Sequence, residues 1–181
     1  MGRAIRAVPT AALRPHEVEA LRRLFEAAWG DEDEAFTDQD WESATGGIHF
    51  VLEEDGAIRS HASVVERELH AGEHRLRTGY VEAVATWPAH HRRGFATEVM
   101  REVGAHIDQG FELGALDTSR QDFYARLGWV VWEGPTFVRT EGGAVRTPEE
   151  DGAVMVRRTL RTPSLDPSAP ISCEWRPGDV W

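Results

Sequence analysis

Residues 79–86 read GYVEAVAT, and residues 91–96, which follow after a short turn, read HRRGFA. The first segment is typical of an apolar β-strand with one acidic side chain, Glu82, and the second of a glycine-containing loop that opens a helix. Backbone N–H groups at a helix N-terminus have no intrahelical partner and carry partial positive charge, so they bind phosphate. A carboxylate on a strand beside such a loop indicates an enzyme that brings a phosphorylated cofactor to a general base.

Strands and helices alternate around this segment. Helical spacing or helix start signals occur at 16–29, from Thr37, at 92–109 and at 119–127, where Ser119 is the expected N-cap. Strands are expected at 5–8, 48–53, 57–68, 75–86, 111–116, 129–132 and 152–160, with a hairpin turn at Asp55-Gly56 and a surface loop at 134–151. This order predicts an α+β fold: a mixed, mostly antiparallel twisted sheet with helices on both faces, and a ligand beside the unit at 79–109.

The length and composition predict a single domain over residues 1–181. Of its 181 residues 41% are hydrophobic, which is enough for one full core. The C-terminal tail, 161–181, has no periodicity but contains Trp175 and Trp181, so we expect it to pack on the body of the domain. The sequence has no apolar run of transmembrane length and no signal-peptide core, which favours a cytoplasmic protein.

Cysteine and histidine usage argues against a metal site. Cys173 is the only cysteine, so no intrachain disulfide and no multi-cysteine site can form. The eight histidines do not show the His-x-x-x-His spacing of a zinc enzyme. We therefore expect no metal.

The formal net charge of −11 argues against nucleic acid and anionic membranes as partners, because both require a positive surface. It is compatible with a cationic substrate, which an acidic cleft would concentrate. A negative surface that only keeps the protein soluble explains the same charge.

Residues 91–96 resemble the cofactor loop of the GNAT acetyltransferases, which reads Arg or Gln, two residues, Gly, one residue, Gly or Ala. Gly94 and Ala96 match the small positions, whereas His91 departs from the usual first residue. Further segments are similar to the aminoglycoside 2′-N-acetyltransferases of that superfamily, among them Gly46-Gly47, Gly128-Trp129, Arg146-Thr147-Pro148 and the C-terminal CEWRPGDVW at 173–181. The resemblance covers nearly the whole chain.

The resemblance implies direct acetyl transfer from acetyl-coenzyme A to the 2′-amine of an aminoglycoside, and hence antibiotic resistance. Glu82 would be the general base, directly or through a water, and Tyr124 the general acid that protonates the leaving thiolate. The N–H group near Val84 would hold the thioester carbonyl at a splayed strand end. The expected cofactor-binding residues are Val84, Ala85, Thr86, His91, Arg92, Arg93, Gly94, Phe95, Ala96 and Thr97.

An aminoglycoside is a polycation, so the resemblance implies carboxylates from separate segments as substrate ligands, near the C-terminal tail. The expected substrate-binding residues are Asp40, Glu82, Ala83, Asp117, Glu149, Glu150, Asp151, Asp179 and the carboxylate of Trp181. Three positions depart from the family pattern: Ala35 where an acid usually precedes Phe36, Asp117 in place of a small hydroxyl residue, and Glu150 in place of Asp. These departures suggest a shifted substrate range that includes kasugamycin.

Other interpretations stay open. From the residues alone, Glu82 could face solvent on an edge strand, and Tyr124 could be a core aromatic. Within the GNAT enzymes, the acceptor could be a polyamine, another amino sugar or a protein lysine. A non-catalytic sensor of acetyl-coenzyme A or an aminoglycoside is the second alternative. The family tendency to form homodimers implies a dimer here.

Overall fold

The computed structural model describes residues 2–30 and 35–181. The acidic run 31–34, which the sequence predicts to be a loop, lies outside the described residues. The chain divides into two compact units: Met1–Val65 with Val81–Val103, and Glu66–Tyr80 with Gly104–Trp181. Three elements run from one unit into the other, namely β3 (Ala57–Ala71), β4 (His74–Thr86) and α3 (Phe95–Gly110). The single domain over 1–181 stays a prediction.

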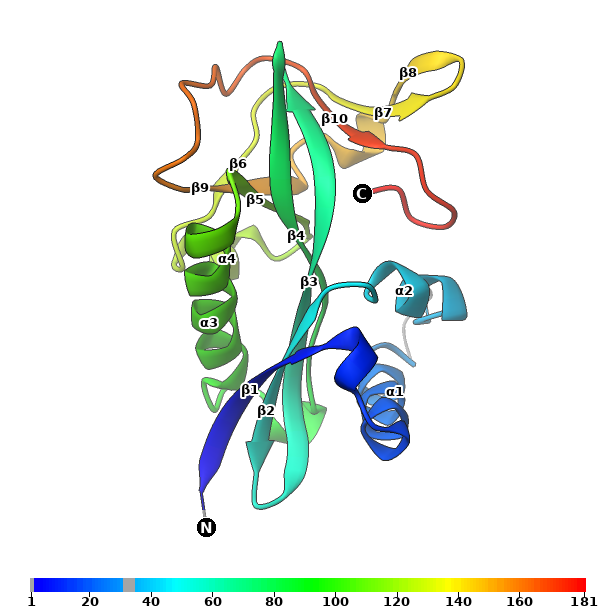
Figure 1. Cartoon of the computed structure of the whole chain (residues 1–181), viewed down its shortest axis with the longest axis vertical. Helices are drawn as coiled ribbons and strands as arrows, with labels where there is room; N and C mark the ends of the chain where they lie inside the picture. The colour runs from blue at the N-terminus through cyan, green and yellow to red at the C-terminus, as the bar shows by residue number, and fades with distance from the viewer. Residues whose placement is uncertain (1, 31–34) are drawn as a thin grey trace. The chain divides into compact units, whose positions relative to one another are not determined.

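The sheet of the first unit is built on an antiparallel hairpin. Strand β1 (Arg3–Pro9) pairs with β2 (Ile48–Glu54), and β2 pairs with the first part of β3, as Figure 1 shows. The turn residues Asp55 and Gly56 have φ of 54° and 75°. Positive φ at both central residues is the requirement of the tight hairpin turn that Asp-Gly favours, so the predicted hairpin is confirmed.

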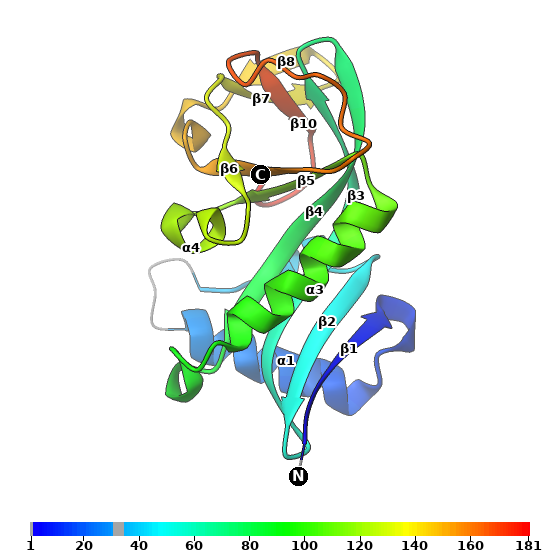
Figure 2. The same cartoon turned by 90° about the vertical axis from the view of Figure 1, so that its left-hand side faces the viewer.

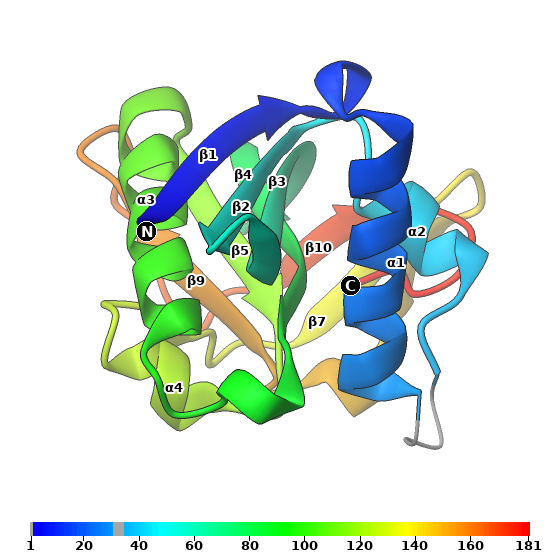
Figure 3. The same ribbon diagram turned by 90° about the horizontal axis from the view of Figure 1, so that it is seen from below.

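Two helices cover this sheet on opposite faces, α1 (Pro15–Trp29) on one and the first part of α3 on the other (Figure 3). Leu21, Leu24 and Phe25 of α1 are fully buried against the sheet. The short helix α2 (Asp38–Ser43) begins at the predicted N-cap, because the Thr37 hydroxyl accepts a hydrogen bond from the Asp40 N–H. Two 3₁₀ turns, η1 (Thr10–Ala12) and η2 (Pro88–His90), complete the unit.

The second unit contains the remaining strands, β5 (Leu113–Asp117), β6 (Val130–Val131), β7 (Thr136–Thr140), β8 (Gly143–Arg146), β9 (Val154–Arg158) and β10 (Ile171–Glu174). Their order is β6-β9-β5-β4-β3-β10-β7-β8, and Figure 2 shows β9 beside β5. Pairs β4/β5 and β10/β7 are parallel, and β5/β9, β6/β9, β7/β8 and β10/β3 are antiparallel. The predicted α+β fold with a mixed, mostly antiparallel sheet is confirmed.

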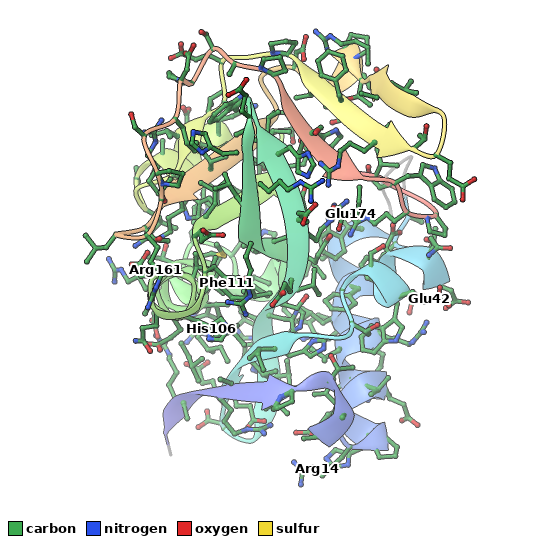
Figure 4. The ribbon with its side chains drawn as sticks, turned by 45° about the horizontal axis from the view of Figure 1, so that its top comes forward. Arg14, Glu42, His106, Phe111, Arg161 and Glu174 are labelled. Carbon is green, nitrogen blue, oxygen red and sulfur yellow. The ribbon has the colours of Figure 1, made fainter. Side chains whose placement is uncertain are left out.

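Close packing of α3 on β4 depends on a glycine. A Cβ at Gly79 would lie 2.9 Å from side-chain atoms of Ile107 and Phe111, which is closer than atoms approach without a shift. The Phe111 ring lies edge-on to the His106 ring, with centroids 5.8 Å apart, and both residues are labelled in Figure 4. The glycine that precedes the acidic strand position therefore serves the helix–sheet contact.

Three local predictions are wrong. Residues 134–151 do not form one loop but contain β7, β8 and the 3₁₀ turn η3 (Pro148–Glu150), because β7 pairs with β8 on one edge and with the distant β10 on the other. Helix α4 (Gln121–Ala125) begins after Arg120, not at Ser119. Helix α3 begins at Phe95, because Arg92 and Gly94 have φ of 62° and 82°, which a helix does not allow.

Candidate functional site

The predicted site residues are divided between the two units. The first unit holds Asp40, the segment 82–86 and the loop 91–97. The second unit holds Asp117, Tyr124, the segment 149–151, Asp179 and Trp181.

Strand β4 has an irregular backbone at the predicted general base. Ala83, directly after Glu82, has φ of 51°, in the left-handed region that only glycine adopts without cost. Such a conformation costs about 1–3 kcal/mol and persists only where the surroundings hold it. The Glu82 side chain is half-buried.

Side chains of β3 form hydrogen bonds to the main-chain carbonyl oxygens of this part of β4. The His61 Nδ1 lies 2.8 Å from the Ala83 oxygen. The hydroxyl of Ser60 donates to the Ala85 oxygen at 2.9 Å, and that of Ser63 to the Glu82 oxygen at 3.4 Å. The strained segment is thus anchored by hydrogen bonds from one neighbouring strand.

The loop before α3 is folded back on the end of β4. The imidazole Nε2 of His91 donates to the Thr86 carbonyl oxygen at 3.0 Å. The Gly94 carbonyl accepts the first helical hydrogen bond, from the Glu98 N–H at 3.0 Å. The N–H groups of the intervening residues, Phe95 to Thr97, therefore form the first turn of a helix that extends from Phe95 to Gly110, a suitable site for a phosphate.

The two arginines of this loop differ in their surroundings. Arg93 forms an ion pair with Glu54 at 3.1 Å, and its guanidinium lies 4.7 Å from the Phe95 ring centre. The Arg92 side chain is exposed. Phe95 as a whole is 1% exposed, so its side chain belongs to the core and is not open to a cofactor.

Asp40 already has partners within its own helix cap. Its Oδ2 accepts hydrogen bonds from the Thr37 N–H at 2.7 Å and from the Thr37 hydroxyl at 2.8 Å. Asp40 therefore closes a capping box as well as being a predicted substrate carboxylate.

In the second unit, Tyr124 lies on α4 and is 8% exposed. Its ring packs edge-on against Phe123 and Trp129, with centroid distances of 4.9 and 6.4 Å. Burial raises the pKa of the Tyr124 hydroxyl to about 12, so the hydroxyl keeps its proton at neutral pH. A protonated hydroxyl is what a general acid requires.

Asp117, at the end of β5, is a largely buried carboxyl group with a raised pKa. Burial and, to a smaller extent, the charge of Asp179 raise the pKa of Asp117 to about 6. Its Oδ1 has no hydrogen-bond partner within residues 2–30 and 35–181. The two carboxyl groups form an acidic pair that a bound ammonium group would stabilise.

The three acidic residues of the segment 149–151 differ in their exposure and in their hydrogen-bond partners. Asp151 forms an ion pair with Arg146 and accepts hydrogen bonds from the Thr136 N–H at 3.1 Å and hydroxyl at 3.0 Å. The Arg146 guanidinium first, and then Thr136, lower the pKa of Asp151 to about 2. Glu149 is exposed and Glu150 half-buried, so Glu149 is the more accessible carboxylate.

Trp181 is anchored in the second unit and is 2% exposed. Its indole N–H donates to the Thr147 hydroxyl at 3.1 Å, and its main-chain oxygen accepts from Arg176 at 3.1 Å. The Trp181 N–H donates to Asp179 at 3.2 Å. These bonds link two predicted substrate residues, Asp179 and Trp181, in one turn.

The sequence of residues 10–132 matches the acetyltransferase (GNAT) domain. The chain belongs to the GNAT acetyltransferase family. The chain is also 42% identical over 183 residues to an aminoglycoside 2′-N-acetyltransferase of Mycolicibacterium fortuitum, a match that spans 97% of this chain and 91% of that protein.

Solved GNAT structures share the fold. A GNAT acetyltransferase from Brucella melitensis in complex with acetyl-CoA superposes with a TM-score of 0.63 and 17% identity, over 94% of both chains. The Escherichia coli GNAT protein YhbS in complex with CoA has a TM-score of 0.65 and 14% identity, over 94% of this chain and 89% of that one. These two GNAT relatives are in complex with acetyl-CoA and CoA, respectively.

One feature of the GNAT domain was missed from the sequence. His49 and His61 are both 0% exposed and are hydrogen-bonded to each other at 2.9 Å, between Nδ1 of His49 and Nε2 of His61. The Asp55-Gly56 turn alone would pair Val51 with Ser60. A register shift between Leu52 and Glu53 pairs Val51 with His61 instead and so places His49 diagonally across the hairpin from His61, which the sequence pattern does not reveal. Within the described parts of the chain, no group of three or more potential ligands could hold a metal. No helix of the described parts is long and apolar enough to cross a membrane.

Proposed function

We propose that this GNAT acetyltransferase transfers the acetyl group of acetyl-coenzyme A to the 2′-amine of an aminoglycoside, and so confers resistance to the antibiotic. The observation that carries this proposal is the 42% identity over 97% of the chain to an aminoglycoside 2′-N-acetyltransferase. The acidic pair Asp117 and Asp179 and the net charge of −11 support a cationic substrate.

In the proposed reaction, Glu82 accepts a proton from the ammonium form of the substrate, directly or through a water. The free amine then attacks the thioester carbon, and the Val84 N–H stabilises the oxygen as negative charge develops on it. The carbon–sulfur bond breaks, and the departing thiolate takes the proton of the Tyr124 hydroxyl. The new amide nitrogen loses its second proton, which restores the Tyr124 hydroxyl. The products are the acetylated aminoglycoside and coenzyme A.

Binding of the two substrates is assigned to separate segments. Strand residues Val84 to Thr86 and the loop from His91 to Thr97 would hold the pantetheine arm and the pyrophosphate. Asp117, Glu149 and Asp179 would bind ammonium groups of the acceptor, because Asp40 already closes the cap of α2 and Asp151 is already paired with Arg146.

A second acceptor, kasugamycin, is favoured by one observation. Asp117 is a largely buried carboxyl group with a raised pKa, at a position where the resembling family has a small hydroxyl residue. An extra carboxylate in the site favours acceptors whose ammonium groups are arranged to reach it.

The test is coenzyme A release with a matched pair of acceptors, kanamycin B with a 2′-amine and kanamycin A with a 2′-hydroxyl. Turnover of kanamycin B alone supports the 2′ assignment, and turnover of both contradicts it. Glu82→Gln and Tyr124→Phe should each lower kcat by about 10²- to 10⁴-fold with folding intact. Release with kasugamycin alone would favour the second acceptor, and no release with any amine would favour a sensor.

A further inference from the structure

The buried histidine pair is one part of a longer hydrogen-bond chain inside the first unit. The Thr10 hydroxyl lies 2.9 Å from Nε2 of His49. Nδ1 of His49 lies 2.9 Å from Nε2 of His61, and Nδ1 of His61 lies 2.8 Å from the Ala83 carbonyl oxygen. All four ring nitrogens of the two imidazoles therefore have a partner, which buried polar groups require.

The donor and acceptor of each hydrogen bond follow from the last acceptor, the Ala83 carbonyl oxygen. A carbonyl oxygen can only accept, so Nδ1 of His61 carries the hydrogen and its Nε2 accepts from Nδ1 of His49. Nε2 of His49 must then accept from the Thr10 hydroxyl. The Gly46 N–H donates to the Thr10 oxygen at 3.0 Å. The Thr10 hydroxyl has a single hydrogen, and it goes to Nε2 of His49 at 2.9 Å rather than to the Gly47 carbonyl oxygen at 3.3 Å. One tautomer of each ring then satisfies all four ring nitrogens, with both imidazoles neutral.

Both imidazoles are held neutral by their surroundings. Burial lowers the pKa of His49 to about 4. Burial and then the neighbouring His49 lower the pKa of His61 to about 3. The hydrogen-bond chain is consequently intact throughout the neutral range.

The end of the chain is the peptide between Ala83 and Val84. This peptide is planar and trans, so its carbonyl and its N–H point in opposite directions. The hydrogen bond from His61 to the carbonyl therefore also sets where the Val84 N–H points. It does so at the residue with φ of 51°, where the backbone needs an external anchor to keep its conformation.

We propose that His61, supported by His49, is a positioning residue that aims the Val84 N–H at the thioester carbonyl of acetyl-coenzyme A. This inference rests on the proposed acetyl transfer and its use of the Val84 N–H. Packing alone does not require histidine here, because the His61 ring also lies edge-on to Phe25 at 5.1 Å, a contact that phenylalanine could make. The hydrogen bond to Ala83 is what the imidazole adds.

Two substitutions separate the hydrogen bond from the packing. His61→Phe keeps an aromatic ring against Phe25 but removes the donor. His61→Asn keeps an N–H donor near the position of Nδ1 and so can still bind the Ala83 carbonyl. We expect His61→Phe to lower kcat by about 10-fold or more, since loss of a complete oxyanion donor costs about 10²- to 10³-fold. His61→Asn should restore most of kcat, with KM for the amine little changed in both.

A second readout does not need the acceptor. The infrared stretch of the ¹³C-labelled thioester carbonyl of bound acetyl-coenzyme A should lie at lower frequency in the wild type and in His61→Asn than in His61→Phe. Calorimetry should show weaker binding of acetyl-coenzyme A to His61→Phe, but unchanged binding of coenzyme A, which lacks this carbonyl. If no amine is acetylated, the proposed function fails while these readouts still decide the inference.

Should His61→Phe fail to fold, His49→Leu provides the milder test, because it leaves His61 in place but removes its supporting donor. We expect an intermediate carbonyl frequency for this variant. An unchanged carbonyl frequency and unchanged kcat in a folded His61→Phe, or in His49→Leu when only that variant folds, would overturn the proposal.

Discussion

The imidazole Nε2 of His91 lies 3.0 Å from the carbonyl oxygen of Thr86. The first residue of the proposed phosphate-binding loop is thereby tied to the last residue of strand β4. The loop and this end of the strand belong to the same unit. The bond therefore fixes the position of one predicted cofactor-binding segment against the other.

Removing this bond should weaken cofactor binding more than catalysis. A net hydrogen bond is worth about 1 kcal/mol, so His91→Ala should raise KM for acetyl-coenzyme A by about 5-fold, with kcat within about 2-fold. Steady-state kinetics with a saturating amine measures both. His74→Ala, at an exposed position on β4, is the matched control. Equal KM values for the two variants would show that His91 does not support the loop.

The raised pKa of Asp117 predicts a pH-dependent affinity for a cationic substrate. As pH falls through about 6 the carboxyl group takes up a proton, so KM for the aminoglycoside should rise in acid. Asp117→Asn should raise KM at pH 7 and remove this part of the pH profile. Asp122→Asn, exposed on α4, should behave as the wild type. A profile that Asp117→Asn leaves unchanged contradicts a substrate role for Asp117.

The same substitution should not destabilise the protein. The folded-state pKa of Asp117 lies above its ordinary value of 3.8, so the folded state binds more protons between pH 3.8 and about 6. Stability contributed by this group is therefore lost as pH rises through that window. Relative to the wild type, Asp117→Asn should raise the melting temperature at pH 7 more than it does at pH 4. A melting temperature that falls at pH 7 would indicate a structural role.

Asp151 is expected to affect stability before it affects substrate binding. Its carboxylate holds Arg146 and Thr136, so Asp151→Asn and Arg146→Ala should lower the melting temperature by similar amounts. Because the pKa of Asp151 is lowered to about 2, its contribution is present above pH 3.8 and is lost as pH falls through about 2. Glu149→Gln should change KM for the amine without changing the melting temperature. The opposite pattern would assign the substrate contact to Asp151.

The buried histidines predict acid sensitivity of folding. The ordinary pKa is 6.5, and the folded-state values are about 4 for His49 and about 3 for His61, so the unfolded state binds more protons below about pH 6.5. Stability should be constant above that pH and fall below it, by about 2 kcal/mol per imidazole at pH 5. Urea unfolding from pH 5 to 8 measures this slope. His49→Asn should flatten it, and an unchanged slope in that variant would mean that other groups cause the loss.

Local sequence signals predicted the parts of the fold that depend on neighbouring residues. Asp55-Gly56 specified its hairpin, because both residues tolerate positive φ. Thr37 specified the start of α2, because its hydroxyl caps the helix three residues away. The apolar spacing of 16–29 marked α1, whose inner face Leu21, Leu24 and Phe25 occupy.

Long-range contacts decided the rest. Strand β7 pairs locally with β8, but its other edge pairs in parallel with β10 from the far end of the chain, and no local pattern reveals that second pairing. The Thr136 hydroxyl of β7 donates to Asp151, which the family resemblance had implied to be a substrate ligand. The left-handed backbone of Ala83 and its bond to His61 also depend on a second strand. Periodicity and turn chemistry act over a few residues, whereas hydrogen-bond partners and burial are set by the folded chain.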